Sequence, residues 1–454
     1  MPRRPGDGTF AVAPGSIGTM TAGLRPITPR RAAWLVAALV LLGGIGAIAA
    51  PALAAAGTSR PRAHAADLLS LSLDRSMRAA GRASGASVVD LATGRALYAN
   101  RAGVGRLPAS VQKLWTTSTA LLAFGPSARL TTSVLADGRL VGTTFHGTLY
   151  LRGGGDPTFG SAGFDQVNYG TGATVQALVA GLIRTLGLRR LDGSVVADES
   201  QSDARRGTPA TGYRADPQVQ GSLSALAFNR DWADPYGQTL FSRPALQAGI
   251  QFAAALRVAG VHVPAATPVR AGMTPASAQP VAAVRSPAIA DLVHLTNTPS
   301  DNFFAETLLK DLGARYGAGG TTSAGAAVVR ATIAATFHLR PRLDDGSGLS
   351  RYDRSTPADV VSLLRQQQAS PAFTSSLAVA GETGTLKHEL RGTAAQGRCR
   401  GKTGTLVDAS SVVGYCRARD GHTLAYAFMM NRINPDVAHP IQNAMELALV
   451  RYDG

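Results

Sequence analysis

Three short segments, each joining a hydroxyl group to a lysine or an amide, constrain this chain more than any other feature. They are Ser110-Val111-Gln112-Lys113, Ser300-Asp301-Asn302 and Lys402-Thr403-Gly404-Thr405. Each has an ordinary structural explanation when it is taken alone. A functional interpretation therefore requires that the chemistry of the three segments and their order along the chain point to the same class of protein.

Lysine is rare in this chain, which makes its positions informative. Only four of the 45 basic residues are lysine: Lys113, Lys310, Lys387 and Lys402. Arginine keeps its proton under ordinary conditions, whereas a buried lysine can lose it. Two of the four lysines fall inside the three segments, so Lys113 and Lys402 are the candidates for functional cations.

The first segment follows Pro108-Ala109 and opens a run, 110–124, with helical composition. A spacing of three residues places Ser110 and Lys113 on one face of a helix. A serine hydroxyl is a poor nucleophile until a base takes its proton, and a desolvated lysine amine can be that base without a histidine. The alternative is that both residues simply lie on a helix surface.

The second segment precedes an apolar helix that contains Glu306. Ser300, Asp301 and Asn302 are also residue types that cap helices, so capping is the alternative to a functional role.

The third segment has the pattern of a strand. Gly404 would let a substrate backbone lie close to that strand, and Lys402 with the hydroxyls of Thr403 and Thr405 would bind a carboxylate. A phosphate loop is excluded, because its first glycine would fall on Gln396 and no helix pattern follows.

The first 56 residues predict export. A run of apolar or small residues, Ala32 to Ala56, follows Arg30-Arg31 and contains the small-x-small sequence Ala52-Leu53-Ala54, which is typical of a cleaved signal segment. The alternative is an uncleaved membrane anchor, because Trp34 to Leu53 is long enough to span a bilayer. Either way, we expect most of the chain to lie outside the cytoplasm.

The net charge of +16 indicates anionic partners. For an exported protein it suits an anionic membrane face or anionic wall polymers, with peripheral or anchored association with the membrane. We find no motif for nucleic acid. The two cysteines, Cys399 and Cys416, cannot build a four-ligand zinc site. Folding about the 406–409 turn would place them opposite each other, where they either form a disulfide or remain free.

A chain of 454 residues should hold two or three domains. We expect an N-terminal tail and signal segment over 1–56, and a discontinuous catalytic domain over 66–126 and 271–454. Between its two parts, 127–270 is predicted to be an inserted β-rich module with one helical piece at 175–186. Further expected elements are a helix at 66–80, a hairpin at 86–91 and 96–100, helices at 289–295 and 302–312, and strands in the last sixty residues.

The order Ser-x-x-Lys, Ser-Asp-Asn, Lys-Thr-Gly is the signature of penicillin-binding proteins and class A β-lactamases. Over most of 66–452 the chain resembles class C low-molecular-mass penicillin-binding proteins, the D-alanyl-D-alanine carboxypeptidase/endopeptidase family. In that family additional domains lie between the first two motifs, which are here 190 residues apart. Other shared segments are Gly154-Gly155-Asp156-Pro157, the run 345–351, and Gly384-Thr385-Leu386.

The resemblance implies an α/β (α+β) fold, in which a transpeptidase/β-lactamase-like domain has an antiparallel sheet flanked by helices. It implies a serine peptidase that acts on peptidoglycan stem peptides and is acylated by β-lactam antibiotics. The resemblance also implies a role for each motif residue. Ser110 would be the nucleophile, Lys113 the base and Ser300 a proton relay, and Asn302 would contact the substrate amide. Lys402, Thr403 and Thr405 would bind the carboxylate beside Gly404, and the backbone N–H groups of Ser110 and Thr405 would form the oxyanion hole.

Other classes fit less well. A class A β-lactamase needs a glutamate for deacylation, and the chain has no Glu-x-x-Leu-Asn sequence. A histidine-dependent hydrolase is disfavoured because no Gly-x-Ser-x-Gly elbow occurs and the eight histidines are scattered. A non-catalytic wall-binding protein of the same fold is disfavoured by the intact motifs. We expect no metal and no cofactor.

Overall fold

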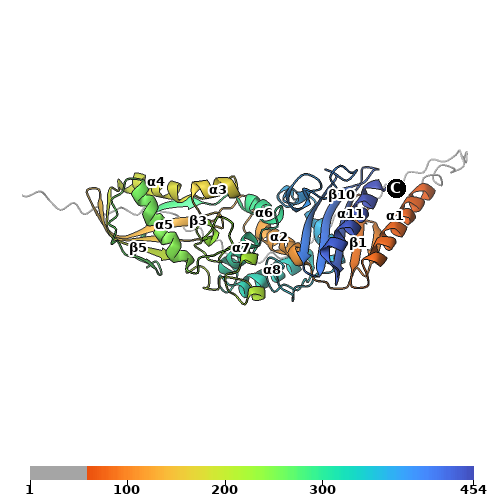
Figure 1. Ribbon diagram of the computed structural model, residues 1–454, viewed down its shortest axis with the longest axis horizontal. Coiled ribbons are helices and arrows are strands. Elements are labelled where there is room, and N and C mark those ends of the chain that lie inside the picture. Colours follow the sequence, from red (N-terminus) through yellow and green to blue (C-terminus); the bar gives the residue numbers. More distant parts are fainter. Residues whose placement is uncertain (1–58) are drawn as a thin grey trace, which may run out of the picture. The chain divides into compact units, whose positions relative to one another are not determined.

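The computed structural model describes residues 59–454 and contains two β-sheets (Figure 1). The predicted signal or anchor segment, Ala32 to Ala56, lies outside the described residues. Among the helices of residues 59–454, none combines the length and the apolar character that a bilayer crossing requires. The architecture is the mixed α/β class that we expected, with helices against both sheets.

The first sheet has six antiparallel strands in the order β2-β1-β11-β10-β9-β8. Both of its faces are covered, so its central strands are buried almost throughout. Its strands are β1 (Gly85–Asp90), β2 (Ala96–Asn100), β8 (Ala378–Val379), β9 (Cys399–Leu406), β10 (Ala409–Arg417) and β11 (Thr423–Asn431).

Two groups of helices cover this sheet. α1 and α11 pack on one face, and the other helices form a helical lobe on the opposite face, as Figure 1 shows for α11 and α2. The helices are α1 (Ser59–Ala79), α2 (Lys113–Ala123), α6 (Ile289–Asn297), α7 (Asn302–Tyr316), α8 (Thr322–Phe337), α9 (Pro357–Gln367), α10 (Pro371–Thr374) and α11 (Pro435–Arg451).

The second sheet has five strands in the order β6-β5-β4-β3-β7 and is mixed. β3 pairs antiparallel with β4 and β7, whereas β5 pairs parallel with β4 and β6, so helices make the crossover connections. Its elements are β3 (Thr131–Val141), β4 (Thr144–Arg152), α3 (Ala162–Asn168), α4 (Val175–Leu186), β5 (Arg190–Asp198), α5 (Pro244–Val258), β6 (Val269–Ala271) and β7 (Gln279–Arg285).

The helix α4 has the bounds that the sequence predicted, and its ends explain why. Thr174 caps the first turn by accepting a hydrogen bond from the backbone N–H of Ala177. Gly187 ends the helix in the left-handed conformation, which a glycine adopts without strain.

The predicted limit of the inserted module at residue 270 falls before the last strand of the second sheet. β7 pairs with β3, so the five-stranded sheet continues to Arg285. The 15-residue helix α5 was not predicted, and it packs beside the five strands of this β-rich module. Strand pairing is non-local, so the sequence of β7 carries no sign of its partner. We propose that the inserted module spans 127–285.

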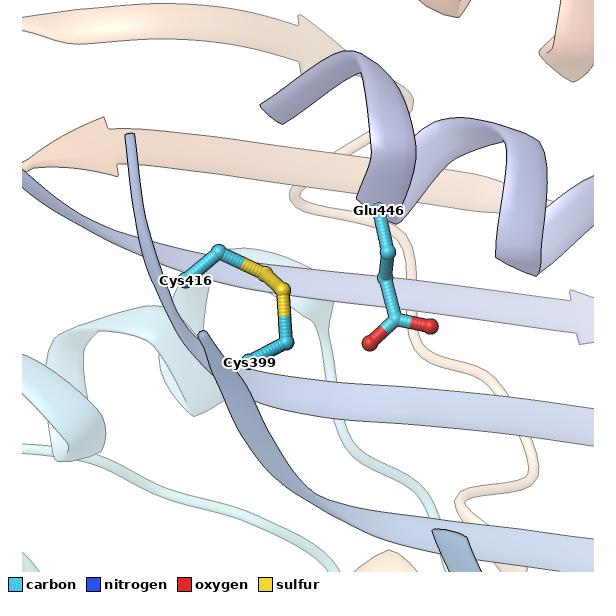
Figure 2. Close-up of side chains that lie close together, drawn as sticks. All are labelled: Cys399, Cys416 and Glu446. Atoms are coloured by element: carbon cyan, nitrogen blue, oxygen red, sulfur yellow. A yellow bond between two sulfur atoms is a disulfide. The ribbon is translucent and has the colours of Figure 1, made fainter. Parts of the chain in front are cut away.

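Two predicted hairpins are present. β1 and β2 pair antiparallel, and so do β9 and β10. In the second hairpin Cys399 lies directly opposite Cys416, and the two form a disulfide (Figure 2). The disulfide arises from the register of one local hairpin, which is why the sequence could indicate it.

Candidate active site

The first motif lies at the junction of two helical segments. A 3-10 turn spans Ala109–Gln112, and α2 begins at Lys113, so Ser110 precedes the α-helix that was predicted to include it. Residues three apart eclipse each other in a 3-10 turn. The Lys113 Nζ donates a hydrogen bond to the Ser110 Oγ over 2.9 Å. The pair predicted from spacing is therefore in direct contact.

Lys113 is fully buried, whereas Ser110 is partly exposed. The Lys113 Nζ also donates to the Asn302 Oδ1 (2.6 Å) and to the backbone carbonyl of Ser347 (2.8 Å). Burial lowers the pKa of Lys113 to about 8, although nearby carboxyl groups, chiefly that of Asp345, partly oppose the shift. An amine with this pKa is deprotonated in an appreciable fraction near neutral pH and can take a proton from Ser110.

The second motif joins a capping role to the site. The Asp301 carboxylate caps α7 by accepting from the backbone N–H of Phe304 at 3.0 Å, so the alternative reading is correct for this residue. Ser300 has a left-handed backbone (φ 67°), which is uncommon for a residue with a side chain. Its Oγ accepts a hydrogen bond from the Lys402 Nζ over 2.8 Å, so the second and third motifs meet.

The third motif lies on β9, as predicted. Lys402 is fully buried, and its Nζ also donates to the Thr403 carbonyl (2.8 Å). Burial holds the pKa of Lys402 well below its usual value, and repulsion from Lys113 lowers it further. Side chains alternate along a strand, so Thr403 and Thr405 face away from Lys402. They line a hollow of about 150 Å³ with Thr385, which accepts from the Thr403 hydroxyl (2.7 Å).

The packing of β9 against the Ser110 turn requires a glycine at position 404, whether or not a substrate is bound. A Cβ at this position would lie 2.5 Å from the Pro108 carbonyl oxygen and 3.0 Å from the Ser110 backbone nitrogen. The expectation that a substrate backbone explains this glycine is therefore incomplete. Its missing side chain lets β9 approach the turn that carries Ser110.

A loop within the predicted 345–351 segment lies behind Lys113. Glu306, one turn after Asn302 on α7, accepts from the backbone N–H groups of Gly346 (3.0 Å) and Ser347 (2.8 Å). Burial, together with the neighbouring Asp345, raises the pKa of Glu306 to about 8. Glu306 therefore holds the loop whose Ser347 carbonyl binds Lys113. The sequence showed Glu306 after the second motif but gave no sign of this role.

The inserted module also reaches the second motif, which the sequence did not indicate. The Asn302 backbone N–H donates to the Gln220 Oε1, and the Asn302 Nδ2 donates to the Gln218 carbonyl, both over 2.7 Å. With its Oδ1 on Lys113, the Asn302 amide is fixed at both ends. The inserted module thus orients a residue that contacts the proposed base.

A buried ion pair makes a second link between the module and this motif. Arg230 contacts the Asp301 Oδ2 at 2.5 Å, and each side chain is only 8% exposed. The Arg230 Nε donates to the Tyr169 hydroxyl, and its guanidinium lies 5.1 Å from the Phe304 ring centre. Such enclosure excludes water from the pair.

The other two lysines lie outside the site. Lys310 forms an ion pair with Asp203 (2.6 Å), so its role is structural, and Lys387 is exposed. Within residues 59–454, the group of possible metal ligands that comes together is Cys399, Cys416 and Glu446. Figure 2 shows the two sulfur atoms bonded to each other beside Glu446, so they are not free to bind a metal.

Comparison with known proteins gives a consistent assignment. The model of the D-Ala-D-Ala carboxypeptidase 3 (S13) family matches residues 69–220 and 218–452. The chain is 29% identical to a D-alanyl-D-alanine carboxypeptidase of Actinomadura sp. (strain R39), covering 94% of this chain and 91% of that protein. It is 28% identical to carboxypeptidase DacB of Mycolicibacterium smegmatis, covering 77% and 76%.

Among solved structures, penicillin binding protein 4 of Haemophilus influenzae is similar in fold. The TM-score is 0.67 at 17% sequence identity, and the match covers 83% of this chain and 98% of the other.

Proposed function

The chain belongs to the D-Ala-D-Ala carboxypeptidase 3 (S13) family, and we propose that it acts on peptidoglycan through an acyl-enzyme on Ser110. It is a serine-type carboxypeptidase that removes the terminal D-Ala of stem peptides outside the cytoplasm. The observation that carries the residue assignment is the 2.9 Å contact between the Lys113 Nζ and the Ser110 Oγ in a buried setting.

Acylation begins when Lys113, as the free amine, takes the proton of Ser110. The Ser110 Oγ then bonds to the carbonyl carbon of the penultimate D-Ala. The negative charge that develops on the carbonyl oxygen is stabilised by the backbone N–H groups of Ser110 and Thr405. The close approach of β9 to the nucleophile turn at Gly404 supports this pairing.

The leaving D-Ala must receive a proton as its C–N bond breaks. We propose that Ser300 passes this proton from Lys113 to the leaving nitrogen. The Ser300 Oγ accepts a hydrogen bond from Lys402, and Lys402 lies near Lys113, because repulsion by Lys113 lowers the pKa of Lys402. Asn302 binds the substrate amide with the part of its side chain that Lys113 and Gln218 leave available. Water then hydrolyses the ester with Lys113 acting again as the base.

The terminal carboxylate of the substrate binds beside β9. The buried Lys402 supplies a cation there, and the hydroxyls of Thr403 and Thr405 are the other donors that the third motif offers to the carboxylate. A cross-linked peptide would present the same acyl group with a larger leaving group, so endopeptidase activity uses the same residues. We propose peripheral association with the membrane through the basic surface of the protein.

Benzylpenicillin tests this assignment, because a β-lactam acylates the nucleophile of such an enzyme. Intact-mass analysis should find one adduct on the wild type and on a Ser323→Ala control, an exposed serine on α8, and none on Ser110→Ala. The wild type should also release D-Ala from a peptide ending in D-Ala-D-Ala. Absence of both the adduct and D-Ala release would favour the non-catalytic wall-binding protein, and rapid destruction of the drug would favour a β-lactamase.

A further inference from the structure

A basic pocket lies at the end of the six-stranded sheet, away from the three motifs. It has a volume of about 540 Å³ and is lined by parts of β9, β10 and β11 with their connections. Four arginines line it, and no acidic residue is among its lining residues: Arg398, Arg400, Arg417 and Arg419. We call this hollow the arginine pocket.

The register of the β9–β10 hairpin explains how the arginines come together. Cys399 pairs with Cys416, so Arg398 lies opposite Arg417, whose backbone N–H donates to the Arg398 carbonyl over 2.9 Å. Side chains two residues apart share a face of a strand. Arg398, Arg400 and Arg417 therefore lie on the face opposite the disulfide.

Little negative charge in the described part of the chain compensates this cluster. Arg419 has a carboxylate within 4.0 Å, that of Asp453 at 3.7 Å, and both side chains are more than half exposed. Arg398 and Arg400 donate to backbone carbonyls instead, those of Ala418 and Thr374. These hydrogen bonds orient the guanidinium groups and leave their charge unneutralised.

Like charges placed opposite each other destabilise a sheet. In this hairpin Arg398 and Arg417 form such a pair. They directly follow the Cys399–Cys416 pair in the register, where the disulfide joins the two strands beside α11 (Figure 2). The covalent link holds the strands together against this repulsion and keeps the pocket in one shape. A preformed site loses less entropy when it binds a ligand.

We propose that the arginine pocket binds the phosphate groups of a phosphodiester polymer in the cell wall. Guanidinium groups bind the oxygens of phosphates and carboxylates in pairs. A single carboxylate would leave most of four positive charges uncompensated, whereas neighbouring phosphates of a polymer supply several negative charges within one hollow. This binding goes beyond the proposed function: it would hold the enzyme on the wall while Ser110 acts on the peptide.

The test uses the full protein and a soluble glycerol-phosphate oligomer as the probe. An Arg400→Ala/Arg417→Ala variant should bind the oligomer at least about tenfold more weakly in isothermal titration, since one charge-assisted contact corresponds to roughly that factor. The matched control is Arg139→Ala/Arg190→Ala, which removes two exposed strand arginines outside the pocket. The control should bind as the wild type does.

Equal weakening in both variants, or no weakening in either, would overturn the pocket assignment. Equal affinity for citrate would overturn the preference for phosphate, and capture by phosphatidylglycerol vesicles without oligomer binding would overturn the polymer. Benzylpenicillin acylation is measured on every variant and should not change. Failure of the arginine pocket proposal is thereby distinguished from failure of the proposed function.

Discussion

Replacing Arg230 by methionine removes the positive member of the buried pair that joins the inserted module to the second motif. The methionine keeps the aliphatic stem among the aromatic rings but leaves the Asp301 carboxylate without its 2.5 Å partner. Removing one partner of a buried ion pair costs about 3–5 kcal/mol, because the remaining charge is desolvated and uncompensated. We expect a loss of this size in the free energy of unfolding.

A double-mutant cycle separates the ion pair from simple loss of packing. Asp301→Asn removes the charge and keeps a residue that caps helices equally well. The Arg230→Met/Asp301→Asn protein should therefore be more stable than Arg230→Met alone, with a coupling energy of about 2–3 kcal/mol. Urea unfolding followed by tryptophan fluorescence gives the four values. An Arg342→Met control, in which an exposed arginine near Tyr352 is changed, should lie within about 0.5 kcal/mol of the wild type.

The same variant tests whether the module positions the site. Asn302 follows Asp301 directly, and its Oδ1 is bound to Lys113. A displacement of about 1 Å at a catalytic group can cost about a hundredfold in rate. We expect benzylpenicillin to acylate Arg230→Met at least about tenfold more slowly, with recovery in the double variant. Additive stabilities in the cycle, or unchanged acylation in a destabilised Arg230→Met, would refute this reasoning.

Three further predictions concern the motifs and the disulfide. In the proposed mechanism Lys113 must be deprotonated to accept the Ser110 proton, and its pKa is about 8, so the acylation rate should rise with pH and level off above about 8; a flat profile from pH 6 to 9 would exclude Lys113 as the base. Gly404→Ala should slow acylation at least about tenfold and lower the thermal midpoint, since its Cβ would lie 2.5 Å from a backbone carbonyl oxygen; wild-type kinetics would contradict this geometry. Cys399→Ala/Cys416→Ala should lose about 3 kcal/mol of stability in urea unfolding, as expected for a loop of this length (separation 17), and no loss under oxidising conditions would contradict the bond.

The sequence by itself was sufficient for features whose cause is local. The Ser110 to Lys113 spacing, the Asp301 cap and the bounds of α4 depend on residues within one or two turns. A single hairpin with a short turn let the sequence place Cys399 opposite Cys416, but only the structure showed that they form a disulfide. The order of the motifs added the fold class and the family, because few folds need these three segments in this order.

The tertiary structure decided what depends on contacts between distant segments. Arg230 meets Asp301 across 71 residues, and β7 closes the inserted sheet beside β3. Glu306 has its role only because the loop at Ser347 folds onto α7. Strand partners and buried charge pairs are chosen by packing in three dimensions, and neither periodicity nor composition records that choice. The sequence therefore indicated the candidate residues of the site, and the tertiary structure determined which other residues hold them in place.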